Sequence, residues 1–177
     1  HTIGEAVALV MLVIFFFLRN PRSTLIPLLT IPISLIGTFM IMYLLNYSLN
    51  TLTLLAIVLA IGLVVDDAIV VLENIYRHIE EGMKPKEAAL LGSREISFAV
   101  IAMTLTLAAV FAPIAFSTGK TGRLFIEFAM TLAGAVIISG FTALTLTPMM
   151  CSRILKQEKE HGRIFNLIES FLQRLSK

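Results

Sequence analysis

The sequence predicts an all-α fold, a polytopic membrane helical bundle, from its composition and from the length of its apolar runs. Of its 177 residues, 57% are hydrophobic and only 15% are charged, whereas about a quarter of the residues of a soluble domain are charged. A soluble core does not need unbroken apolar runs of about 20 residues, which is the length that crosses a bilayer. The composition therefore excludes an ordinary soluble domain.

Five apolar runs are each long enough, or nearly so, to cross about 30 Å of hydrocarbon as a helix. The predicted spans are residues 2–18, 25–45, 52–72, 98–116 and 125–150. Together they form a partial transmembrane domain over residues 1–155. The connections between them are short, so successive helices should run antiparallel. The longest connection is the polar stretch from Tyr76 to Ser97.

A different pattern follows the last predicted span. From Ile164 to Leu175, apolar side chains recur at helical spacing and polar side chains take the other face. This segment is too polar to cross a membrane. We expect residues 156–177 to form a cytoplasmic linker and an amphipathic helix lying in the membrane interface. The alternative is a helix of a soluble domain.

Lysine and arginine residues are divided unevenly between the two sides of the predicted bundle. The side that contains the first turn, residues 19–24, holds twelve of the 14 basic residues, and the opposite side holds only Lys120 and Arg123. Cytoplasmic loops retain basic residues. We therefore expect the first turn and the stretch from Tyr76 to Ser97 to face the cytoplasm.

The sequence implies no cofactor, no metal site and no nucleic-acid partner. The single cysteine, Cys151, has no Cys or His neighbour at metal-ligand spacing, and His78 and His161 fall in expected loops. The net charge of +2 comes from basic residues scattered in short loops rather than from a basic patch. The chain opens at His1 without a signal-peptide pattern, and we expect it to be part of a longer membrane protein.

Two adjacent carboxylates interrupt the third predicted span. Asp66 and Asp67 lie in the segment GLVVDDAIVVLEN, from Gly62 to Asn74, with apolar residues on both sides. Two ionised aspartates near the centre of a membrane helix cost roughly 5 to 7 kcal/mol. Asp66 is expected about 6 to 8 Å from the middle of the span, which argues against full solvation at the interface. Acidic residues at such depth typically line ion or substrate pathways, so the pair is the candidate site.

Helical geometry restricts how the pair can work. Consecutive residues point about 100° apart, so Asp66 and Asp67 can both address a bundle interior but cannot share one proton. Each needs its own partner from another helix. A nearby cation changes the proton affinity of a carboxylate, which is what proton coupling requires. Since no predicted span has a lysine or arginine in its middle, we expect the cation to come from chain outside this sequence.

Glu73 and Asn74 lie two turns beyond the pair and are secondary candidates, either for proton entry or as the polar exit of the span into the cytoplasm. Two rival functions are also considered. An intramembrane aspartyl protease holds one water between aspartates from separate helices, whereas these two are adjacent. A membrane scaffold, whose polar residues only join helices, would be favoured if both aspartates proved fully solvated.

Two segments resemble those of a known transporter family. NTLTLLAIVLAIGLVVDDAIVVLENIYRH, from Asn50 to His78, and TLTPMMCSRIL, from Thr145 to Leu155, are similar to the hydrophobe/amphiphile efflux (multidrug) branch of the RND (resistance-nodulation-division) transporters. The resemblance covers nearly the whole chain, from the second to the sixth transmembrane helix of such a protein. The paired aspartates favour this branch over the heavy-metal branch, which typically has one aspartate there.

The resemblance implies a function that composition alone does not. Members of this branch are secondary active transporters rather than enzymes. They are homotrimers of the bacterial inner membrane that use proton influx to export drugs and other amphiphiles through a periplasmic adaptor and an outer-membrane channel. The resemblance implies that Asp66 and Asp67 are proton-relay carboxylates, paired with a lysine from the second half of the bundle. It also implies that the substrate pockets are largely periplasmic, so this sequence does not identify the substrate.

Overall fold

A computed structural model of the chain describes residues 4–5, 8–9, 12–13, 21–116 and 119–155. Its elements are the helices α2 (Pro21–Leu44), α3 (Thr51–Glu80), α4 (Pro85–Phe111) and α5 (Gly119–Ile154), with a 3-10 turn η1 (Ala112–Phe116) after α4. These four helices are long and apolar enough to cross a membrane, which confirms the predicted all-α membrane bundle. The first predicted span, residues 2–18, lies largely outside the described residues, and the predicted interfacial helix, within residues 156–177, lies outside them.

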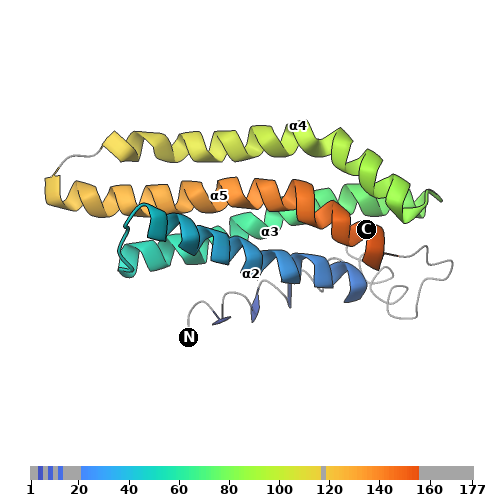
Figure 1. Ribbon diagram of the computed structural model, residues 1–177, viewed down its shortest axis with the longest axis horizontal. Helices are drawn as coiled ribbons and strands as arrows, with labels where there is room; N and C mark the ends of the chain where they lie inside the picture. The colour runs from blue at the N-terminus through green and yellow to red at the C-terminus, as the bar shows by residue number, and fades with distance from the viewer. Residues whose placement is uncertain (1–3, 6–7, 10–11, 14–20, 117–118, 156–177) are drawn as a thin grey trace, which may run out of the picture.

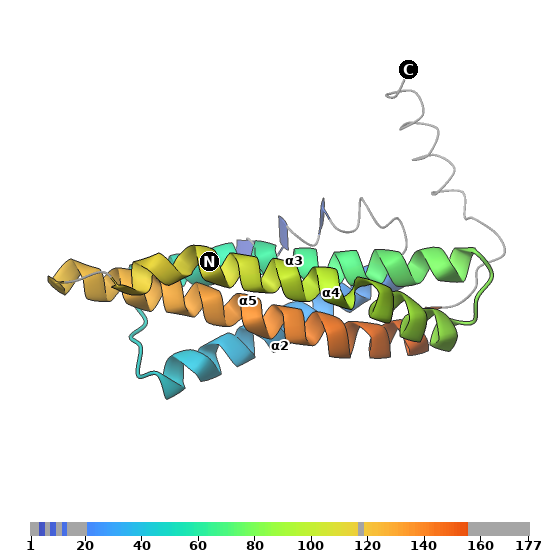
Figure 2. The same ribbon diagram turned by 90° about the horizontal axis from the view of Figure 1, so that it is seen from above.

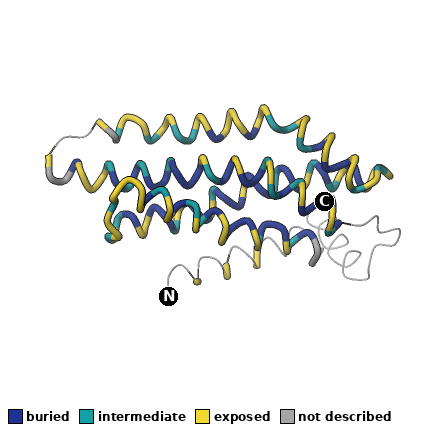
Figure 3. The backbone as a smooth tube through the Cα atoms, viewed as in Figure 1, coloured by how far each residue is buried: buried dark blue, intermediate teal, exposed yellow. Residues whose placement is uncertain are grey.

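The four helices lie side by side, and successive helices run antiparallel (Figure 1). α3 and α5 form the centre, because α5 packs against α2, α3 and α4 while α3 also contacts α2 and α4. Viewed from above, the axes of α3, α4 and α5 are nearly aligned, and the axis of α2 crosses them obliquely (Figure 2). Buried residues concentrate along α3 and α5, whereas α4 is mostly exposed (Figure 3). The central pair therefore provides the most enclosed positions of the described bundle.

The start of α3 is fixed by a capping box. The Asn50 side chain accepts hydrogen bonds from the backbone N–H groups of Leu52 and Thr53, at 2.9 and 3.0 Å. In return, Thr53 Oγ1 accepts one from the Asn50 backbone N–H at 2.9 Å. These bonds satisfy donors that the first turn of a helix leaves unpaired. They determine where α3 begins and hence how far along it the aspartates lie.

The turn between α3 and α4 is shorter than the sequence suggested. Only residues 81–84 connect the two helices, and His78, expected in a loop, is part of α3. We interpreted the stretch from Tyr76 to Ser97 as a connection because it is polar. Glu, Arg and Lys are nevertheless good helix formers, so both helices continue beyond their apolar spans. This end of the bundle is therefore a helical hairpin. We call it the inner end, after the orientation predicted from the sequence, and the opposite end the outer end.

Small residues on one face of α5 allow it to pack closely against the bundle. The residues of this face, spaced four apart, are Ala135, Ser139, Ala143 and Thr147, and all four are buried. A small-residue face lets helix backbones approach each other in a membrane. The burial of all four residues is what such a packing surface requires. The face brings α5 against α3 at the level of the aspartates.

Candidate functional site

Asp67 points from α3 into the bundle, toward α5. Only 3% of its surface is exposed, and its Oδ2 accepts a hydrogen bond from Ser139 Oγ at 2.6 Å. Bonds of this length between a hydroxyl and a carboxylate are typical of charge-assisted hydrogen bonds. Ser139 Oγ also lies 3.3 Å from the carbonyl oxygen of Val64. The serine hydroxyl thus has two acceptors on α3, and the carboxylate is the closer one.

Asp66 points away from the neighbouring helices. Its side chain is exposed, as is Gly62 about one turn earlier, and a Cβ atom added at Gly62 would meet nothing within 4 Å. Leu55 and Leu59 continue this surface, each 48% exposed. We call the surface formed by Leu55, Leu59, Gly62 and Asp66 the open face of α3. In the described part of the chain, neither aspartate forms an ion pair.

The two secondary candidates, Glu73 and Asn74, lie in different surroundings, as the two aspartates do. Glu73 is exposed and lies two turns beyond Asp66, on the side of the open face. Asn74 is directed toward α4, where its Nδ2 donates to the carbonyl oxygen of Gly92 at 2.8 Å. Within the described residues, no hydrogen bond joins either of them to an aspartate. The structure therefore does not bring Glu73 or Asn74 into direct contact with the pair.

Ser139 is a site residue that the sequence did not reveal as one. Its place on the small-residue face of α5 indicates helix packing alone, yet its hydroxyl binds the Asp67 carboxylate. The two residues are 72 positions apart in the sequence, and no short motif connects them. The only available signal was the repeat of small residues on α5, which shows that a helix approaches but not which helix.

A second buried carboxylate lies at the outer end of the bundle. Glu127 of α5 is 5% exposed, and its Oε2 accepts hydrogen bonds from Ser48 Oγ at 2.8 Å and Asn50 Nδ2 at 3.0 Å. Arg123 Nε lies 3.7 Å from the other carboxylate oxygen. These contacts join the α2–α3 connection to α5. Glu127 is well satisfied, so it serves to hold the outer end together.

The geometry of the aspartates disagrees with both rival functions. Asp66 and Asp67 are the only aspartates in the sequence, and they point in different directions from one helix. They therefore cannot hold a shared catalytic water, as an aspartyl protease does. Asp67 is buried, so the full solvation of both aspartates that would favour a scaffold is not observed. One carboxylate inside the bundle and one on its open face can instead hold protons in two different environments.

The fold and the site together define a polytopic helical membrane protein with paired carboxylates in a central helix. The AcrB/AcrD/AcrF family matches this chain over residues 1–177. The chain is 54% identical over 176 residues to an uncharacterized transporter of Haemophilus influenzae. It is 58% identical over 161 residues to multidrug resistance protein MdtC of Klebsiella pneumoniae, and 59% identical over 151 residues to MdtC of Pantoea ananatis. The chain belongs to the AcrB/AcrD/AcrF family of RND transporters.

The alignments cover most of this chain but little of each relative. They include 99%, 91% and 85% of the chain, and 17%, 16% and 15% of the Haemophilus, Klebsiella and Pantoea proteins, respectively. The chain thus spans about a sixth of the length of the curated relatives that it matches. The expected resemblance to the RND transporters is confirmed, and the described helices correspond to membrane-spanning parts of such a protein.

Proposed function

We propose that this chain supplies the proton-relay portion of the transmembrane domain of a proton/substrate antiporter that exports drugs or other amphiphilic compounds. The observation that carries the proposal is the asymmetric pair in α3. Asp67 is buried against Ser139 of α5, and Asp66 is exposed on the open face. Membership of a family whose relatives include proteins named for multidrug resistance supports the export of such compounds.

Ser139 gives Asp67 two states that differ in hydrogen bonding. When the carboxylate is charged, it accepts the serine hydroxyl hydrogen at Oδ2. When Asp67 is protonated, it becomes a donor as well as an acceptor. The serine hydroxyl can then accept from Asp67 and donate to the carbonyl oxygen of Val64, which lies 3.3 Å away. Proton binding is thereby linked to a change in the contact between α3 and α5.

Asp66 requires a partner from outside the described bundle. An ionised carboxylate in an apolar environment is stabilised only by a nearby opposite charge or by hydrogen bonds. The described residues offer Asp66 no ion pair, whereas the open face has space beside it at Gly62. We assign this partner to a cationic residue from the second half of the complete transporter. Binding and release of that cation couple protonation to conformation.

The membrane location, oligomeric state and partners that we propose are those expected for the family. We place the chain in the bacterial inner membrane, in a multi-pass homotrimer that works with a periplasmic adaptor and an outer-membrane channel. In this arrangement residues 1–155 contribute to the transmembrane domain and residues 156–177 form the cytoplasmic linker and interfacial helix. The chain needs no cofactor for this role, because the transported protons are held by carboxylates.

Replacing either aspartate in the complete transporter tests the proposal. Asp66→Asn and Asp67→Asn keep the shape of the side chain but can carry neither the proton nor the charge. We expect both variants to lose the efflux of a fluorescent amphiphile from cells while still assembling in the membrane in wild-type amounts. Glu80→Gln, which neutralises an exposed acid at the end of α3, is the matched control. Normal efflux by either aspartate variant would refute the relay assignment.

A further inference from the structure

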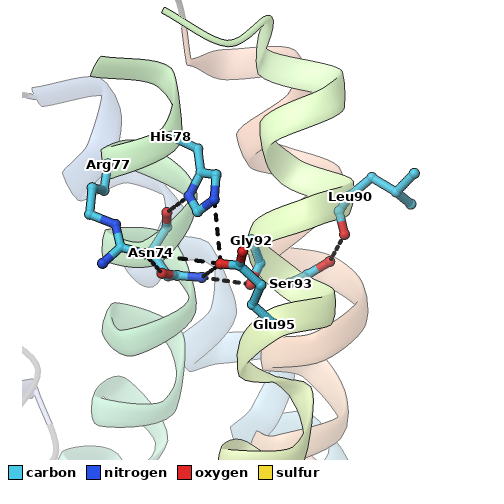
Figure 4. Close-up of polar contacts among 7 residues, drawn as sticks. All are labelled: Asn74, Arg77, His78, Leu90, Gly92, Ser93 and Glu95. Atoms are coloured by element: carbon cyan, nitrogen blue, oxygen red, sulfur yellow. Dashed lines mark hydrogen bonds and ion pairs between the residues drawn. The ribbon is translucent and has the colours of Figure 1, made fainter. Parts of the chain in front are cut away.

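A cluster of polar side chains joins α3 to α4 near the inner turn (Figure 4). Asn74, Arg77 and His78 come from α3, and Gly92 and Glu95 come from α4. The close-up shows the side chains of His78 and Glu95 directed toward each other across the gap between the two helices. None of these residues belongs to the aspartate site described above, so the cluster calls for a separate explanation.

Asn74 connects the two helices through its side chain. Its Nδ2 donates to the carbonyl oxygen of Gly92 at 2.8 Å and lies 3.3 Å from Glu95 Oε2, while its Oδ1 accepts from Arg77 Nη2 at 3.0 Å. Gly92 makes this possible because a Cβ atom there would lie only 3.1 Å from Ile75 Cα. The helix backbones are therefore in near contact at this point, and Asn74 binds directly to the backbone of α4.

His78 adds a second link between the helices. A carbonyl oxygen can only accept, so Nδ1 of the imidazole donates in its 2.9 Å bond to the Asn74 carbonyl oxygen. This bond orients the ring, and its other nitrogen, Nε2, lies 3.4 Å from Glu95 Oε2, where it pairs with the carboxylate when the imidazole also carries a proton on Nε2. The same carboxylate oxygen is 4.0 Å from Arg77 Nη2. Only 8% of the His78 side chain is exposed, whereas 46% of the Glu95 side chain is, so a buried imidazole here meets a carboxylate at the surface of the bundle.

The cluster is aligned with Asp67 along α3. Asn74 follows Asp67 by two turns, which corresponds to about 10 Å along the helix axis and a rotation of only about 20°. Asn74 and Asp67 therefore occupy nearly the same face, one bound to α4 and the other to Ser139 of α5. A helix transmits rotation along its length because its backbone hydrogen bonds are continuous. Any rotation of α3 at Asn74 consequently changes the direction of Asp67.

We propose that Asn74, His78 and Glu95 form a positioning latch, which fixes the rotation of α3 against α4 so that Asp67 stays in register with Ser139. The inference rests on the proposed relay, to which it adds residues that touch neither aspartate. The latch acts through the geometry of the helix and passes no proton to or from the aspartates. Loss of the latch should therefore slow the relay step without altering how the transporter binds its substrate.

The test uses the complete transporter in proteoliposomes with Glu95→Ala, Glu95→Gln, His78→Ala and the double variant His78→Ala/Glu95→Ala. We expect Glu95→Ala to lower the maximal rate of transport at least about threefold, in line with the coupling energies of contacting residues, with an unchanged substrate concentration for half-maximal rate. Glu95→Gln should recover part of the rate, because its amide oxygen still accepts. The maximal rate of the double variant should be no lower than that of the more severe single variant, because His78 and Glu95 act as one unit.

Arg94→Ala removes a charge from an exposed neighbour on α4 and serves as the matched control. Hydrogen exchange in residues 70–80 provides a readout that does not depend on proton transport. Faster exchange in Glu95→Ala but not in Arg94→Ala, together with the reduced maximal rate, would support the latch. If hydrogen exchange in Glu95→Ala were unchanged, the latch would be overturned while the relay stood. The same would follow if exchange were faster but transport kept its wild-type rate. Normal transport by Asp67→Asn in the same assay would overturn the relay and the latch together.

Discussion

Asp66 and Asp67 are neighbours in the sequence, but they meet different surroundings because a helix turns about 100° per residue. That rotation places Asp67 against the small-residue face of α5 and Asp66 on the open face of α3. A relay needs this difference, since two carboxylates in identical surroundings would bind protons alike. The chemistry of the site therefore depends on one step of helical rotation as well as on the presence of two acids.

Ser139→Ala in the complete transporter should reduce the rate of proton-driven transport about tenfold. The substitution removes the hydroxyl that donates to Asp67 at 2.6 Å, and a hydrogen bond to a charged group is worth roughly 1.5 to 3 kcal/mol. Transport into inside-out vesicles measures the effect. Ser152→Ala is the control, because the Ser152 hydroxyl donates to the Met149 carbonyl oxygen of its own helix. A Ser139→Ala variant as fast as the wild type would show that the serine does not tune Asp67.

Glu127→Ala should destabilise the protein by about 1 to 3 kcal/mol, because it removes two hydrogen bonds to a buried charged group. The bonds lost are those donated by Ser48 Oγ and Asn50 Nδ2. Thermal unfolding of the detergent-solubilised transporter measures the loss as a lower melting temperature. Glu127→Gln should lose less, because its amide oxygen can still accept. Equal melting temperatures for Glu127→Ala and the wild type would mean that this contact does not hold the outer end.

At the residue scale, the sequence predicted the aspartates but not their partners. Asp66 and Asp67 are conspicuous because charged residues are costly in an apolar span. Ser139 and Glu127 are not, since a serine is common on packing faces and a glutamate near a helix end is usually solvated. Ser139 and Glu127 have their roles because of contacts between segments far apart in the chain. The periodicity of residues within one helix does not predict such contacts.

At the scale of elements, glycine determines how closely α4 approaches its neighbours. A Cβ atom at Gly92 would lie 3.1 Å from Ile75 Cα and 3.2 Å from Ile75 N in α3. A Cβ atom at Gly140 of α5 would collide with the side chain of Thr104 in α4. Backbone atoms cannot move aside as a flexible side chain can, so the contact at Gly92 is the more sensitive of the two.

Gly92→Ala should therefore destabilise the complete transporter by about 1 to 3 kcal/mol, the typical cost of overpacking. The added methyl group forces α4 away from Ile75 and weakens the bond from Asn74 to the residue 92 carbonyl oxygen. Melting temperature in detergent provides the measurement. Ser93→Ala, one residue further along α4, adds no atom and should melt like the wild type. If Gly92→Ala were equally stable, the helices would not be in close contact there.

The apolar pattern predicted the four helices α2, α3, α4 and α5, but it did not locate their ends. Apolar residues are needed only where lipid or protein surrounds the helix, whereas the helix itself continues wherever its residues favour it. For this reason α3 reaches Glu80 and α4 starts at Pro85, inside a stretch that polarity marked as a connection. Two elements stay predictions: the span at residues 2–18 and the amphipathic segment after residue 155.

At the scale of the whole molecule, the two ends of the described bundle differ in their number of basic residues. The inner turn between α3 and α4 carries Lys84 and lies close to Lys86 and Arg94, whereas Arg123 is near the start of α5 at the opposite end (Figure 1). Basic residues are retained on the cytoplasmic side. The orientation predicted from the sequence is therefore compatible with the arrangement of the four helices.

A cysteine at Lys84 in the complete transporter should not react with a membrane-impermeant maleimide added outside spheroplasts, while one at Arg123 should. Arg123 is an appropriate counterpart because 82% of its side chain is exposed. Mass shift of the labelled protein measures the reaction, and the parent protein controls for Cys151, which is buried. Labelling at Lys84 from outside, with Arg123 protected, would reverse the topology.

In the function that we propose, the aspartates of α3 carry the protons that drive export. Proton flux through the complete transporter in proteoliposomes, followed with a lumenal pH dye as substrate is added, tests this most directly. We predict that Asp66→Asn and Asp67→Asn each abolish the substrate-dependent flux, whereas Glu87→Gln, at an exposed acid in the first turn of α4, retains it. Substrate-dependent proton flux at the wild-type rate through either aspartate variant would contradict the account.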